Sequence, residues 1–83
     1  MPYHSQMLGL FDAIRSAASK SDLSTVQKKA GELADVARNL RLALESSGPP
    51  PPAIAVEGQA VMGAASEVER RARAVATCAG ASA

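Results

Sequence analysis

Two heptad patterns of apolar residues, one on each side of a proline run, constrain the fold of this chain more than any other feature. A 3-4 spacing places apolar side chains along the face of a helix that packs against another helix. The first pattern comprises Leu23, Val26, Ala30, Leu33, Ala37, Leu40 and Leu44. The second comprises Ile54, Gly58, Val61, Ala65, Val68, Ala72, Val75 and Ala79. The sequence therefore predicts two long helices with one buried face each.

The prolines from Pro49 to Pro52 predict that these helices form an antiparallel hairpin. Gly48 can end the first long helix in a left-handed conformation, and the prolines prevent its continuation. Four residues in polyproline II geometry span roughly 12 Å, which is enough to connect two adjacent helix ends. The pairs expected across the hairpin are Leu40 with Val61, Leu33 with Val68, Val26 with Val75, Ala37 with Ala65 and Ala30 with Ala72. Facing alanines predict a close approach of the two helices.

A shorter amphipathic helix is expected before the hairpin. At about four turns it is too short to be stable alone, so its bulky face must dock elsewhere. The predicted elements are helices at about 5–19, 23–46 and 53–79, with a proline linker at 47–52. The predicted fold class is all-α: an antiparallel helical hairpin with a short leading helix, forming a three-helix bundle that can dimerise.

The composition predicts a core that needs help from a partner. The chain has 83 residues, so it forms one domain, and its apolar residues are mostly alanine and valine, with Tyr3 and Phe11 as the aromatic residues. Small side chains bury little apolar area, and a chain of this length buries only about 60–65% of its unfolded surface. We therefore expect the chain to associate with itself or with another small helical protein.

The predicted interaction surface joins the first helix to an apolar stripe beside the heptad pattern. Its members are Met7, Leu10, Phe11 and Ile14 from the first helix and Val36, Leu42 and Met62 from the hairpin. The first helix can cover this stripe on its own hairpin or reach it on a second copy, with residues 19–22 as a hinge. Exchange of such an element between copies produces a symmetric dimer.

Charge and hydropathy argue against a nucleic-acid or membrane partner. The net charge is +1 and both signs are mixed along the chain, so no basic surface is expected. No apolar stretch approaches ~18 residues, and the N-terminus lacks the features of a signal peptide. We expect a cytoplasmic protein, and export without a cleaved signal stays open.

The sequence offers no set of residues for catalysis or for metal or cofactor binding. His4 and Cys78 are the single residues of their types and lie in separate regions, whereas a metal site needs three or four convergent ligands. The heptad positions are apolar or glycine, so acidic and basic groups are expected on outer faces rather than in an enclosed site. An enzyme is therefore not expected.

These features predict a non-catalytic helical interaction or assembly module. The alternative is a small secreted or chaperone-like hairpin that pairs with another helical protein. Hairpins exported by type VII-like secretion systems turn through a Trp-x-Gly motif, whereas this chain has no tryptophan and turns through Gly48 and the prolines. The likeness is limited to architecture, and the sequence assigns no family.

The heptad pattern makes Leu33 a central residue of the hairpin core. Substituting Leu33→Ala should lower the free energy of unfolding by about 2–5 kcal/mol, because it removes buried methyl groups and leaves a cavity. Urea denaturation followed by circular dichroism measures this loss. A change within about 0.5 kcal/mol, typical of a surface position, would contradict the heptad assignment.

Overall fold

The computed structural model describes residues 2–82 and contains three α-helices. α1 spans Pro2–Ser19, α2 spans Leu23–Ser46 and α3 spans Ala55–Ser82, with a short 3-10 helix, η1, at Pro52–Ile54. The predicted all-α class and the antiparallel hairpin are confirmed. α1 begins about one turn earlier than predicted, and α3 ends about one turn later, which are usual differences for helix ends.

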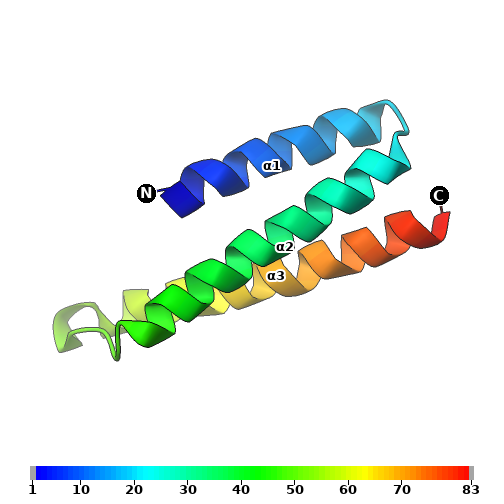
Figure 1. The fold of residues 1–83 in the computed structure, drawn as a ribbon. Coiled ribbons are helices and arrows are strands. Elements are labelled where there is room, and N and C mark those ends of the chain that lie inside the picture. Colours follow the sequence, from blue (N-terminus) through cyan, green and yellow to red (C-terminus); the bar gives the residue numbers. More distant parts are fainter. Residues whose placement is uncertain (1, 83) are drawn as a thin grey trace.

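α2 is the central helix, and α1 and α3 are arranged around it (Figure 1). α1 and α3 both pack on α2 and run antiparallel to it, so that they run in the same direction as each other. Within residues 2–82, no Cα atom of α1 lies within 8 Å of a Cα atom of α3. The result is an open bundle of 46 × 21 × 17 Å in which α1 and α3 occupy different flanks of α2.

Local side chains and backbone geometry define both ends of α2. Asp22 is the N-cap: its Oδ1 accepts a hydrogen bond from the Thr25 backbone N–H at 3.2 Å, and its Oδ2 accepts one from the Thr25 hydroxyl at 2.6 Å. Such a cap satisfies a backbone donor that the first turn leaves unpaired. At the other end Gly48 has φ of 79°, the left-handed conformation that the sequence predicted.

The core of the hairpin is built mainly from alanine. The side chains of Ala30, Ala34 and Ala37 on α2 are completely buried. They are accompanied by buried alanines on α3, which are Ala65, Ala72 and Ala79, and by the larger side chains of Val26, Leu33 and Leu40. Small side chains allow two helix backbones to approach closely.

The valines of α3 do not all lie in this core. Leu33 packs with Ala72 and with its predicted partner Val68. Val26, for which Val75 was the predicted partner, belongs to a buried cluster with Ala79. Val61 and Val75 are 47% and 43% exposed, so the prediction that they fill the hairpin core is wrong.

The physical reason is that α3 is turned about its axis relative to the heptad prediction. Its face toward α2 includes half-buried Met62, Glu69 and Ala76 next to the buried alanines. Alanine on alanine permits more close contacts between the helices than a row of valines would, and dispersion contacts favour the tighter arrangement. The valines consequently lie along one edge of the hairpin interface.

Ion pairs join α2 to α3 at the opposite edge of that interface. Arg41 Nη2 lies 3.2 Å from Glu69 Oε1, and Arg73 Nη2 lies 3.4 Å from Asp35 Oδ1. Within single helices, residues four apart form three further ion pairs, between Arg41 and Glu45, between Glu67 and Arg71 and between Glu69 and Arg73. The ion pairs between helices add directional contacts to an interface of small apolar groups.

The proline turn leaves room at Gly58 for glycine alone. A Cβ atom at Gly58 would lie 2.8 Å from Cβ and Cγ of Pro50, whereas one at Gly63 would meet no atom within 4 Å. Gly63→Ala should therefore raise the free energy of unfolding by about 0.5–1 kcal/mol, because alanine is the better helix former.

The matched variant Gly58→Ala should fail to stabilise the protein and should lower its stability, since the rigid Pro50 ring cannot move aside without disturbing the turn. Urea denaturation of both variants measures the difference. Equal stabilisation by both alanines would show that Pro50 does not pack on Gly58.

Candidate functional site

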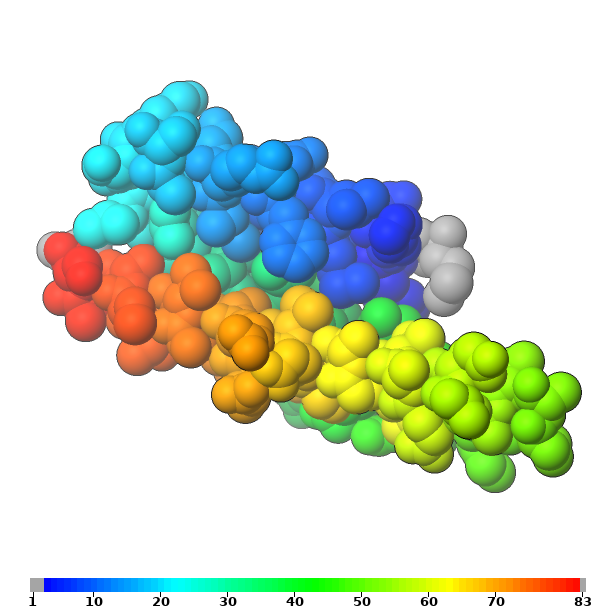
Figure 2. Space-filling model, turned by 180° about the vertical axis from the view of Figure 1, so that it is seen from behind, coloured from blue at the N-terminus to red at the C-terminus, as the bar shows by residue number. Residues whose placement is uncertain are grey.

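An apolar groove runs between α1 and α3, with α2 as its floor (Figure 2). Three hollows follow one another along α3. The first two are lined by residues of all three helices, and the third is lined by α2 and α3 alone. The first is lined by Tyr3, His4, Met7, Leu40, Leu44, Val61, Ala64, Ala65 and Val68. The central one is lined by Phe11, Ile14, Ala30, Leu33, Val68, Arg71, Ala72 and Val75. The third is lined by Leu23, Val26, Ala74, Val75, Cys78, Ala79 and Ser82.

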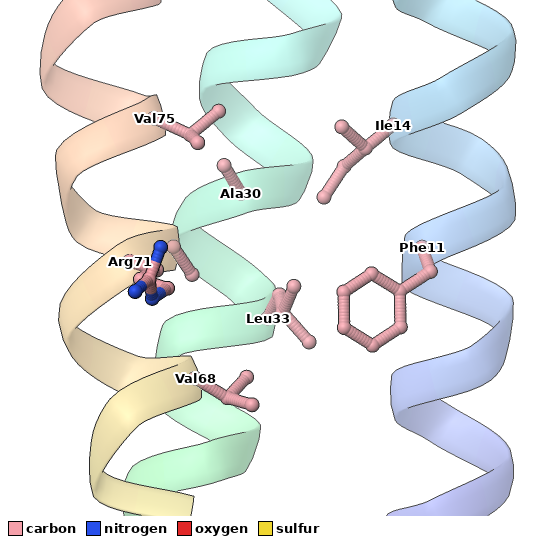
Figure 3. Close-up of a pocket in the computed structure, with 8 residues that line it drawn as sticks. Phe11, Ile14, Ala30, Leu33, Val68, Arg71 and Val75 are labelled. Carbon is pink, nitrogen blue, oxygen red and sulfur yellow. The ribbon is translucent and has the colours of Figure 1, made fainter. Parts of the chain in front are cut away.

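The central hollow is a space of about 340 Å³ at the middle of the groove. Figure 3 shows Phe11 and Ile14 extending from α1 toward Leu33 on the floor, with Val68 and Val75 on the α3 wall. The Phe11 side chain is 42% exposed although it is the largest apolar group in the wall. The hollow therefore presents an aromatic edge and aliphatic walls to its surroundings.

The groove follows from the way in which α1 and α3 contact α2. Half-buried Met7, Leu10 and Ile14 fix α1 against the core cluster that contains Leu33 and Ala34. α3 contacts α2 through alanines and turns its valines toward the space between α1 and α3. Because α1 and α3 do not meet, the strip of α2 between them is covered only by side chains from its two flanks.

The charged group in the groove wall is paired within the chain. Arg71 lines the central hollow, and its Nε donates a hydrogen bond to Glu67 Oε1 at 2.7 Å. Arg70 also donates to Glu67, and the hydrogen bonds from Arg70 and Arg71 lower the pKa of the Glu67 carboxyl to about 2. Arg71 therefore shares one carboxylate with Arg70, and the three groups together keep one positive charge.

The predicted residues of the first helix are all placed on its inner side or at its groove edge. Met7, Leu10 and Ile14 pack on the helix's own hairpin, so α1 covers that hairpin intramolecularly. Phe11 is the most exposed of the four and faces the groove.

The three other predicted residues are not brought together. Val36 lies beside α1 in a shallow depression with Leu10, Met62 lies against the proline turn, and Leu42 is 40% exposed and lines none of the three hollows. The prediction of one continuous stripe is therefore wrong. Residues six apart on a helix, such as Val36 and Leu42, point about 120° apart and cannot share a face.

The groove residues that sequence reasoning missed are Val61 and Val75 on α3. Their heptad spacing was the available signal, but it assigned both valines to the hairpin core. Hydrophobic spacing shows which face of a helix is apolar. The exact rotation of the helix about its own axis depends on how that face packs on the neighbouring helix.

The polar side chains of the described residues do not converge on a reaction centre. Within residues 2–82, no three His, Cys, Asp or Glu side chains are grouped as a metal site requires. The Cys78 thiol is exposed at one end of the groove, and His4 lies at the other end. None of the helices in this range combines the length and apolar content that crossing a membrane requires.

Comparisons with known proteins add no relative to this description. No family model, no curated protein and no solved structure matches the chain. The function is therefore inferred from the groove itself.

The ion pairs of Glu67 predict a pH dependence that NMR can measure. The Glu67 carboxyl should titrate with a pKa of about 2, below its ordinary value of 4.5. Because the pKa is lowered in the folded state, the pairs stabilise the fold above the ordinary value, and this contribution is lost as the pH falls toward 2. Replacing both Arg70 and Arg71 with glutamine should return the Glu67 pKa toward the ordinary value.

The control for this titration is Arg38→Gln on α2. It removes the charge of an arginine that is not paired with Glu67. It should leave the Glu67 pKa where it is in the parent protein. An unchanged Glu67 pKa in the double glutamine variant would show that Arg70 and Arg71 do not hold this carboxylate.

Proposed function

We propose that the protein is a non-catalytic helical interaction module whose groove binds an apolar helical surface of a partner protein. The observation that carries the proposal is the exposure of large apolar side chains along one groove, with Phe11 and Val75 at its centre and Val61 toward one end. Contiguous exposed apolar surface on a small protein is typical of protein interaction sites.

The shape of the groove suits a helix. α1 and α3 form two parallel walls along α2, and a fourth helix laid between them would complete a four-helix arrangement. An amphipathic helix presents apolar anchors at spacings of three, four and seven residues, which matches a succession of hollows along one direction. The alanines that line the walls leave space for such anchors.

The chemistry of the walls supports binding rather than catalysis. A catalytic site needs a nucleophile or base within hydrogen-bond reach of a second polar group that orients it. The central hollow is lined by aliphatic and aromatic groups and by Arg71, which is hydrogen-bonded to Glu67. This lining favours the burial of apolar area, which is the main source of free energy in most protein associations.

Site-specific photo-crosslinking tests the proposal. The photoreactive amino acid p-benzoylphenylalanine is placed at Val75 in the groove and, as a matched control on the same helix, at exposed Thr77. In cells that make the protein, irradiation should yield one discrete adduct from position 75, identified by mass spectrometry, and none from position 77. Absence of an adduct at position 75, or equal adducts at both positions, would contradict the proposed function.

A further inference from the structure

We infer that the occupant of the groove is a second copy of this chain, placed groove to groove about a two-fold axis that passes close to Phe11. This inference rests on the proposed function and names its partner. It differs from an exchange of α1 between copies, because α1 is already packed on its own hairpin through Met7, Leu10 and Ile14. Each protomer keeps its fold, and the two open faces cover each other.

The accessible surface of the chain exceeds the value expected from its mass by about the area that one partner buries in such an interface. A folded monomer of 8.5 kDa is expected to expose roughly 4,700 Å² by the usual scaling of surface with mass. This chain exposes 5410 Å², an excess of about 700 Å² over that scaling. A standard specific interface buries about 800 Å² on each partner. An interface of this standard size would offset an excess of that magnitude.

The groove face is also compatible with its own copy in charge. In an isologous dimer the same surface lies on both sides, so an unpaired charge would meet the same charge across the axis. The charge in the central hollow is that of Arg71, which is paired with Glu67 on the same helix and whose side chain is 75% exposed. The two ion pairs between α2 and α3 involve Arg41, Glu69, Arg73 and Asp35, none of which lines the groove. Two such faces can therefore meet with Arg71 held in an ion pair on each side.

The position of Phe11 follows from the symmetry. Two grooves cover each other over their whole length only if the two-fold axis crosses near their middle. The central hollow lies between the two others, and Phe11 is its largest side chain, 42% exposed at the edge of α1 (Figure 3). An exposed aromatic side chain beside the axis meets its own copy, and each ring can enter the hollow formed by Leu33, Val68 and Val75 of the other protomer.

Sedimentation velocity on the pure full chain tests the inference. At tens of micromolar the parent protein should sediment with twice the 8.5 kDa mass of the chain. Phe11→Glu and Phe11→Lys should each weaken self-association by at least about a hundredfold, because each places two like charges face to face. An equimolar mixture of the two variants should recover the dimer, since opposite charges then meet across the axis.

Two further variants keep the outcome decisive. Leu42→Glu is the matched control, because Leu42 is as exposed as Phe11 but lies outside the groove, and it should remain dimeric. Val75→Glu changes a second exposed groove residue and should also dissociate the dimer. It replaces the Phe11 variants as the test if these lose their helical circular dichroism.

A monomeric parent protein would overturn the inference, and so would separate Phe11 variants that stay monomeric when mixed. The crosslinking result distinguishes these failures from a failure of the proposed function. An adduct of Val75 with a different protein would keep the interaction module and replace the second copy as its partner. No adduct at all would remove both.

Discussion

The close contact between the alanines of α2 and α3 determines most of what is distinctive about this molecule. Completely buried Ala30, Ala34 and Ala37 face a row of buried alanines on α3. Because alanine carries a single methyl group, these contacts require short distances between the helices and bury little area per residue. The hairpin is consequently narrow, and its larger apolar side chains must find contacts outside the interface or stay exposed.

The groove is the direct consequence of that packing. With its alanines against α2, α3 turns Val61 and Val75 toward α1, which is held on the other flank of α2. Within residues 2–82 the backbones of the two outer helices stay apart, so their apolar edges and the floor of α2 form a hollowed face. The ion pairs between α2 and α3 occupy the opposite edge of the hairpin.

Stability and binding are linked in such a design. A chain of this size has a small core, and its stability increases whenever a partner binds the folded state alone. The groove residues that would contact a partner, such as Phe11, Val61 and Val75, are among the apolar residues that the three helices leave exposed. An interaction module of this kind completes its hydrophobic core only in the complex.

The sequence by itself determined the elements and their order. Heptad spacing, the proline run and Gly48 were enough to predict three helices and an antiparallel hairpin, because helix periodicity and helix termination are local properties. The contact between Leu33 and Val68 also followed from the pattern. The tertiary structure alone decided how α3 is rotated on α2, which flank of α2 holds α1, and therefore that Phe11 faces a groove rather than a stripe with Val36 and Leu42. These features depend on the competition between alanine and valine contacts across two helices, which no spacing within one helix contains.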